Sequence, residues 1–138
     1  MNKKTESRSV RIIGGEWRRR LLPVADITGL RPTTDRVRET LFSWLQFDLP
    51  SANCLDAFAG SGALGFEAAS RGAKKVTLLE RDLIAFKNLQ IAHTSLLKSE
   101  DPTVMQRLQI EQTDALQWLS NPSDQVFDIV FLDPPFVD

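Results

Sequence analysis

Apolar residues after position 50 alternate between short continuous runs and longer stretches with helical spacing. Short apolar runs are typical of buried strands, and apolar residues spaced i, i+3, i+4 and i+7 are typical of amphipathic helices. The predicted strands cover 52–58, 75–80, 107–112 and 126–132. The predicted helices cover 63–71, a longer stretch that starts at Asp82 with Ala85, Leu89, Ala92 and Leu96 on its apolar face, and 114–119. Strands alternating with helices predict right-handed crossovers and a parallel α/β sheet.

The first 50 residues follow a different pattern. Two short apolar runs, 9–13 and 16–22, flank Gly14 and Gly15, and a two-residue glycine turn between such runs predicts a β-hairpin. Thr33, Thr34 and Asp35 offer a helix start ahead of apolar residues with helical spacing. We therefore expect a hairpin or arm over 1–30 and an α/β core over 31–138.

The charges are divided unevenly between these two parts. Residues 1–38 hold ten lysines and arginines against four acidic residues, whereas 39–138 hold seven against fourteen, within a net charge of −1. A basic segment on an acidic body is the layout expected when one region meets a polyanion such as RNA. A solvated basic tail explains the same charges equally well.

Composition limits the kinds of site that the chain can form. The 138 residues contain one cysteine and one histidine, which excludes a disulfide framework and a zinc site built from Cys and His. We therefore expect no metal. The basic N-terminus and the lack of a long apolar stretch predict a cytoplasmic protein with no membrane partner.

A glycine loop follows the first core strand, in the segment Asp56-Ala57-Phe58-Ala59-Gly60-Ser61-Gly62. Glycines let a ligand lie against the backbone, and the start of a helix offers free N–H donors. Gly60, Gly62 and Gly65 also match the dinucleotide pattern G-x-G-x-x-G. Asp56 favours a different ligand, because a carboxylate repels a pyrophosphate and attracts a cationic amino-acid group. A tight strand-to-helix turn without any ligand is the remaining interpretation.

Two further acids follow predicted strands. Glu80 ends its strand where a carboxylate can accept both hydroxyls of a ribose, a role that either nucleotide interpretation predicts. Asp114 could meet the exocyclic amine of an adenine, or could simply cap the next helix.

The most specific motif is Asp133-Pro134-Pro135-Phe136, at the end of the last predicted strand. Prolines restrict the backbone and donate no hydrogen bond, so the Asp133 carboxylate and nearby carbonyls become fixed acceptors. Such acceptors can orient an exocyclic amino group and stabilise developing positive charge, while Phe136 stacks on a flipped base. An ordinary acidic turn is the structural alternative.

These motifs, in this order, resemble those of class I S-adenosylmethionine-dependent methyltransferases that methylate amino groups. The segments 11–18 (RIIGGEWR) and 31–42 (RPTTDRVRETLF) resemble the bacterial RsmD-type family, which methylates the exocyclic N2 of a guanine in 16S ribosomal RNA. The resemblance covers nearly the whole chain. It implies S-adenosyl-L-methionine as cofactor, direct methyl transfer, and 16S ribosomal RNA or the assembling small subunit as partner of a monomer.

The resemblance also implies a fold and site residues. The fold is a Rossmann-like core with strand order 3-2-1-4, and because family members continue with further strands, we expect a C-terminally incomplete core. The catalytic motif is Asp133, Pro134, Pro135 and Phe136. The implied cofactor residues are Asp56, Phe58, Ala59, Gly60, Ser61, Gly62, Glu80, Arg81, Asp114 and Ala115. The implied RNA-binding residues are Arg11, Trp17, Arg18, Arg19, Arg20, Arg31, Arg36 and Arg38.

Other functions stay open at this point. The same motif could methylate adenine, cytosine or a protein glutamine. A NAD-dependent oxidoreductase is disfavoured by Asp56, and a non-catalytic RNA-binding module would not need Asp133.

Overall fold

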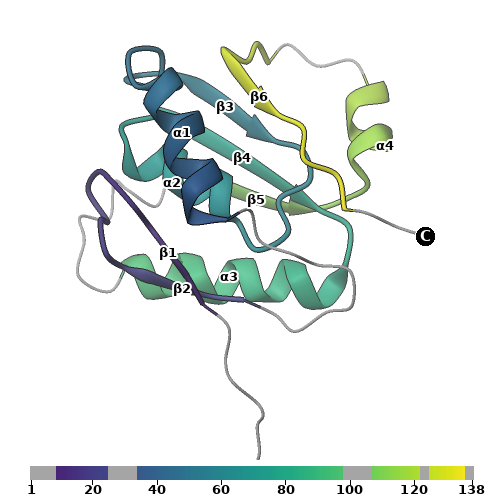
Figure 1. Cartoon of the computed structure of the whole chain (residues 1–138). Coiled ribbons are helices and arrows are strands. Elements are labelled where there is room, and N and C mark those ends of the chain that lie inside the picture. Colours follow the sequence, from purple (N-terminus) through teal and green to yellow (C-terminus); the bar gives the residue numbers. More distant parts are fainter. Residues whose placement is uncertain (1–8, 25–33, 98–106, 122–124, 136–138) are drawn as a thin grey trace, which may run out of the picture.

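The computed structural model describes residues 9–24, 34–97, 107–121 and 125–135, drawn as coloured ribbon in Figure 1. In chain order the elements are β1 (Ser9–Arg11), β2 (Leu21–Pro23), α1 (Asp35–Leu45), β3 (Asn53–Asp56), α2 (Ala63–Ser70), β4 (Lys75–Glu80), α3 (Leu83–Leu97), β5 (Leu108–Gln112), α4 (Ala115–Ser120) and β6 (Ile129–Phe131).

A parallel sheet of four strands, in the order β5-β4-β3-β6, forms the centre of the molecule (Figure 1). Counted from β3 as the first core strand, this is the predicted order 3-2-1-4. All three pairings are parallel, so the carboxyl ends of the strands meet at one edge. The α/β fold predicted from the sequence is confirmed. A change of direction in strand order occurs beside β3, the usual position of a ligand crevice in such sheets.

The two faces of the sheet are covered differently. One buried cluster joins α1, α2, α3 and the β1–β2 hairpin to the sheet, with Phe42, Phe66 and Leu89 among its fully buried members. A smaller cluster on other strand positions contains Leu55 and Leu79 and is covered by Ala115 and Trp118 from α4. The two central strands, β3 and β4, are therefore buried on both faces, which explains why apolar residues predominate in them.

Helix starts follow the side chains that the sequence indicated. The Thr34 Oγ1 accepts a hydrogen bond from the Val37 N–H at the start of α1. The Asp82 carboxylate accepts from the Ala85 N–H at 2.9 Å at the start of α3. Each cap satisfies a backbone donor that has no partner within its own helix.

The predicted hairpin is present, but its turn is not where the sequence placed it. Val10 pairs with Leu22 in antiparallel register, and residues 12–20 form the connection. The glycine pair lies inside this longer connection, where it approaches α2 instead of reversing the chain. The two-residue turn was wrong because the glycines serve a tertiary contact, which local sequence does not reveal.

Two predicted strands are shorter than their apolar runs. The strand expected over 126–132 pairs regularly only at Ile129–Phe131, because its start is held by Asn53, whose Nδ2 donates to the Val126 carbonyl at 2.6 Å. The strand expected over 52–58 ends at Asp56, where the chain turns into the glycine loop.

Among the residues that the structure describes, no helix is both long enough and apolar enough to cross a membrane.

Candidate functional site

Acidic side chains gather at the carboxyl edge of the sheet. Asp56 is the last residue of β3 and pairs in register with Phe131 of β6, two residues before Asp133. Glu80 is the last residue of β4 and pairs with Gln112 of β5, two residues before Asp114. The topology therefore brings together acids that lie up to 77 positions apart in the sequence.

The glycine loop is a compact turn between β3 and α2. The Gly62 N–H donates to the Ala59 carbonyl at 2.7 Å, and the Ala59 N–H donates to the Leu79 carbonyl at 2.9 Å, which anchors the loop to β4. Gly62 caps α2 with φ of +85°, and a Cβ there would lie 2.4 Å from the Phe66 ring. Both the backbone conformation and the packing require glycine at this position.

Asp56 is a buried acid beneath this loop, with 1% of its surface exposed. Its Oδ2 accepts from the Gly65 N–H at 3.0 Å, and among the described residues its buried Oδ1 has no hydrogen-bond partner. The pKa of Asp56 is raised to about 7, chiefly by burial; the Gly65 N–H opposes this rise, and the negative charges of Asp133 and Glu80 contribute to it. A buried acid with an unused oxygen and two acidic neighbours is a site at which a cationic ligand group is stabilised.

Glu80 links the second strand to the glycine loop. Its Oε1 accepts from the Gly60 N–H at 2.9 Å, and its Oε2 accepts from the Asp82 N–H at 2.9 Å. Each carboxylate oxygen has a further lone pair, so Glu80 can hold the loop and still accept hydroxyl groups of a ligand.

Asp114 is a helix cap. Its Oδ1 accepts from the Leu116 N–H at 2.8 Å and from the Gln117 N–H at 3.1 Å, while its Oδ2 lies 3.7 Å from the Arg81 Nη1. Of the two interpretations of Asp114, the cap is therefore observed. Ala115 is buried directly after it, and the half-buried Phe58 packs in the same small cluster.

The chain leaves β6 through Asp133, Pro134 and Pro135, all of which are exposed. The negative charge of Asp133 contributes to the raised pKa of Asp56. Phe136 lies outside the described residues, as does Arg31.

Five of the expected RNA-binding residues are arginines whose side chains are exposed or half-buried. Arg11, Arg18, Arg19 and Arg36 are exposed, and Arg20 is half-buried with its Nη2 donating to the Ser95 carbonyl at 2.8 Å.

The predicted role in RNA binding is wrong for Trp17 and Arg38. Trp17 is 1% exposed and packs in the main core, and Arg38 is 0% exposed, so neither presents a side chain to an RNA. Arg38 is instead ion-paired with Glu67 on α2 and with Asp35 on its own helix.

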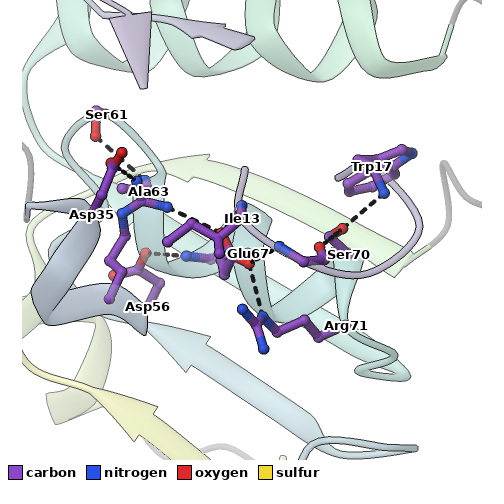
Figure 2. A network of polar contacts seen from close by, with 12 residues as sticks. Ile13, Trp17, Asp35, Asp56, Ser61, Ala63, Glu67, Ser70 and Arg71 are labelled. Atoms are coloured by element: carbon purple, nitrogen blue, oxygen red, sulfur yellow. Dashed lines mark hydrogen bonds and ion pairs between the residues drawn. The ribbon is translucent and has the colours of Figure 1, made fainter. Parts of the chain in front are cut away.

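Glu67 is the residue that the sequence reasoning missed (Figure 2). It is fully buried on α2 and binds groups from two other parts of the chain, together with Arg71 at the end of its own helix. The available signal was a single charged residue inside a helix of otherwise small or apolar residues, ALGFEAAS. A lone charge in such a helix implies a buried partner.

The described residues offer little for other chemistry. No group of three or more His, Cys, Asp or Glu side chains in them is arranged to hold a metal ion. Cys54 is buried in β3, and burial together with the charge of Asp128 raises the pKa of its thiol to about 11, which disfavours a thiolate nucleophile.

Comparison with known proteins assigns the family. A family model described as "Conserved hypothetical protein 95" matches residues 10–138. The chain belongs to this family. A relative from Haemophilus influenzae named "Ribosomal RNA small subunit methyltransferase D" is 52% identical over 132 residues, covering 92% of this chain and 64% of the relative. The protein of the same name from Escherichia coli strain K12 is 49% identical over 130 residues, covering 94% and 62%.

A solved structure gives the same result for the fold. "Putative methyltransferase yhhF" from Escherichia coli is 46% identical, with a TM-score of 0.81, covering 94% of this chain and 66% of that one. The resemblance to the RsmD-type family and the class I methyltransferase fold are thereby confirmed. The chain spans just under two thirds of the length of the curated relatives it matches.

Proposed function

We propose that this chain provides the cofactor-binding core and catalytic motif of an S-adenosylmethionine-dependent methyltransferase acting on the N2 amino group of a guanine in 16S ribosomal RNA. One observation carries the proposal: Asp56 and Glu80, which frame the glycine loop, lie at the same sheet edge as the Asp133-Pro134-Pro135 segment. The names of the curated relatives support the substrate class.

The cofactor assignment rests on two carboxylates. Asp56 has a buried, unpartnered oxygen among the described residues, suited to an ammonium group, and Glu80 offers acceptors for ribose hydroxyls. When bound, S-adenosylmethionine supplies a methyl group on a positively charged sulfur. A carboxylate at Asp56 opposes the pyrophosphate of a dinucleotide, so NAD is the less favoured ligand.

The Asp133 segment would position the acceptor base. Hydrogen bonds from the amino N–H groups to the Asp133 carboxylate orient the nitrogen lone pair and stabilise its developing positive charge. The amino nitrogen would gain a bond to the methyl group as the methyl–sulfur bond breaks to leave a neutral thioether, and it would release one proton, for which a carboxylate is an acceptor. Phe136 is proposed to stack on the flipped base.

The exposed arginines Arg11, Arg18, Arg19 and Arg36 are proposed to hold RNA phosphates, with Arg20 at the margin. A protein that acts on ribosomal RNA is expected in the cytoplasm, and we propose that it works as a monomer.

The decisive experiment measures methyl transfer from labelled S-adenosylmethionine to 16S ribosomal RNA, naked and in small subunits, followed by nucleoside analysis. We expect N2-methylguanosine, and loss of turnover in Asp133→Ala with cofactor affinity within about twofold of the unmodified chain. Methylated adenine, cytosine or protein glutamine would replace the substrate assignment. Undiminished RNA binding without any methyl transfer would favour a non-catalytic RNA-binding module.

A cheaper measurement tests the cofactor separately. Calorimetric titration compares S-adenosylmethionine with NADH, and Glu80→Ala is the control. Binding of NADH in preference to S-adenosylmethionine would overturn the cofactor assignment.

A further inference from the structure

One buried carboxylate joins the N-terminal hairpin to the core. The Glu67 Oε1 accepts from the Ile13 N–H at 2.9 Å and from the Arg38 Nη1 at 3.0 Å. Its Oε2 accepts from the Gly14 N–H at 2.9 Å and from the Arg71 Nε at 2.8 Å. Each oxygen thus receives two donors, and the carboxylate holds the hairpin connection, α1 and the end of α2 at a single point.

Ser70, less than one turn further along α2, continues the same attachment (Figure 2). Its carbonyl accepts from the Glu16 N–H at 2.7 Å, and its hydroxyl accepts from the Trp17 N–H at 2.8 Å and donates to the Gly14 carbonyl at 2.7 Å. A Cβ on Gly15 would lie 2.0 Å from the Ser70 carbonyl oxygen, so the backbones are in direct contact. Four of the five residues between positions 13 and 17 are therefore hydrogen-bonded to α2.

The other end of α2 is the candidate cofactor loop. The helix begins at Ala63, directly after Gly60, Ser61 and Gly62, and the Gly65 N–H donates to Asp56. All eight residues of α2 are buried. One short, buried helix consequently fixes the hairpin at its carboxyl-terminal half and the glycine loop at its start.

The two strands of the hairpin are also held by apolar packing of Val10 and Leu22 in the main buried cluster. The polar contacts of the connection outside α2 are fewer and less buried. The Arg107–Glu16 ion pair is 3.0 Å long, but the two side chains are 27% and 37% exposed. Exposed pairs contribute little because water and salt screen them. Glu67, at 0% exposure, is not screened in this way.

We propose that Glu67 is a positioning residue that holds the basic hairpin in a fixed orientation relative to the cofactor loop, so that RNA bound by the hairpin is presented to the Asp133 segment. This inference rests on the proposed function. Glu67 acts through the backbone of Ile13 and Gly14 and touches no RNA. Without it, the strands stay packed in the core, whereas the connection that carries Arg18 and Arg19 keeps its charges and loses the carboxylate that fixes Ile13 and Gly14.

A positioning role and a contact role change RNA binding differently. Removing a phosphate contact lowers the affinity and also lowers the slope of log affinity against log salt by about 0.7 to 0.9. Releasing the hairpin lowers the affinity through the entropy of an unfixed segment and leaves the number of phosphate contacts unchanged. The salt slope therefore separates the two roles.

The test uses Glu67→Gln, whose amide cannot accept hydrogen bonds at both positions of the carboxylate. Ser70→Ala is a milder second variant that keeps every charge. Glu111→Gln is the matched control, because it removes one negative charge from a side chain whose partner, Gln109, lies on its own strand. For each variant we would measure amide hydrogen exchange, affinity for S-adenosylhomocysteine, and affinity for 16S ribosomal RNA over a range of salt.

In Glu67→Gln we expect the amides of Ile13 and Gly14 to exchange at least about tenfold faster and RNA affinity to fall about tenfold with an unchanged salt slope. Ser70→Ala should lower RNA affinity about threefold in the same manner. S-adenosylhomocysteine affinity should stay within about twofold in both, and Glu111→Gln should match the unmodified chain.

Several results would overturn the proposal. Unchanged amide exchange in both variants would mean that Glu67 and Ser70 do not hold the connection. A reduced salt slope would assign Glu67 an effect on phosphate contacts. A parallel loss of S-adenosylhomocysteine affinity would show that Glu67 stabilises the whole fold and does not specifically position the hairpin. If the unmodified chain binds no RNA, the proposed function fails, whereas normal RNA binding by Glu67→Gln overturns this inference alone.

Discussion

The carboxylate of Asp56 lies against the first turn of α2, where its Oδ2 accepts a hydrogen bond from the Gly65 N–H at 3.0 Å. The second oxygen is buried and without a partner among the described residues. This arrangement is costly for an ionised acid, because a single hydrogen bond does not replace the water that burial removes. A group held in this way at a ligand crevice is typical of sites where function takes precedence over stability.

The first prediction concerns stability against pH. The pKa of Asp56 is raised from 3.8 to about 7 in the folded chain, chiefly by burial. Between these values the folded state binds one more proton than the unfolded state, so unfolding releases a proton and stability falls as pH rises. The contribution of Asp56 is therefore fully present below pH 3.8 and lost as the pH passes about 7.

Asp56→Asn isolates this contribution. An amide oxygen still accepts from Gly65 and has no charge to bury, so we expect a higher melting temperature than the unmodified chain at pH 8 and a smaller decline between pH 5 and 8. Thermal melts across this range, without ligand, make the measurement. A variant that melts below the unmodified chain at pH 8 would show that Asp56 is not destabilising in its ionised form.

The second prediction concerns the pH dependence of ligand affinity, which has the opposite direction to the pH dependence of stability. A cationic group binds the ionised form of Asp56, so affinity for S-adenosylmethionine should rise by up to about tenfold per pH unit below pH 7 and level off above it. Methylthioadenosine, which lacks the amino-acid group, is the matched ligand and should show no such dependence. Equal pH profiles for both ligands would remove Asp56 from the proposed ammonium site.

The third prediction concerns Glu80. Glu80→Gln keeps one acceptor and loses the charge, and charge-assisted hydrogen bonds contribute about 1.5 to 3 kcal/mol each. We expect S-adenosylmethionine affinity to fall about tenfold to 100-fold. Glu111→Gln, on the neighbouring strand, is the control for the loss of one negative charge. If calorimetry gave the same affinity for Glu80→Gln and the control, Glu80 would serve only to hold Gly60.

The core could be predicted from the sequence because its signals are local. The apolar runs gave the strands, Thr34, Asp82 and Asp114 gave the helix starts, and alternation of strands and helices gave the parallel order. These features depend on residues within one turn or one strand, so no knowledge of distant contacts was needed.

The hairpin connection and the buried ion pair could not be predicted in the same way. Gly14 and Gly15 have the composition of a turn, but their positions are determined by α2, more than 50 residues away. Arg38 lies in a basic segment, and only the packing of α1 on α2 reveals that its guanidinium is buried. A sequence gives the charge of a residue, whereas its exposure depends on the tertiary fold.

The fourth prediction separates two costs of replacing a glycine, at Gly62 in the glycine loop and at Gly72 after α2. Gly62→Ala introduces a side chain at φ of +85° and places its Cβ 2.4 Å from the Phe66 ring. Gly72→Ala introduces one at φ of +108°, with its nearest neighbour at 3.7 Å. The backbone cost, about 1 to 2 kcal/mol, applies to both, whereas overpacking adds about 1 to 3 kcal/mol only at Gly62. Denaturant unfolding should therefore show the larger loss for Gly62→Ala, and equal losses would mean that Phe66 moves aside freely.

The fifth prediction contrasts two arginines that lie two positions apart on α1. Arg38→Met removes a buried partner of Glu67, and breaking a buried pair in this way costs about 3 to 5 kcal/mol. Arg36→Ala removes an exposed side chain and should leave the free energy of unfolding within about 0.5 kcal/mol.

For the salt dependence of RNA affinity, we expect Arg36→Ala to have the larger effect and Arg38→Met the smaller. The salt slope of RNA affinity should fall by about 0.7 to 0.9 in Arg36→Ala, because a phosphate contact is lost, and should be unchanged in Arg38→Met at temperatures where it is folded. A reduced slope in Arg38→Met would mean that the guanidinium reaches RNA after all, which requires α1 to move away from α2 in the complex. An unchanged slope in Arg36→Ala would instead restrict the proposed RNA surface to the hairpin arginines.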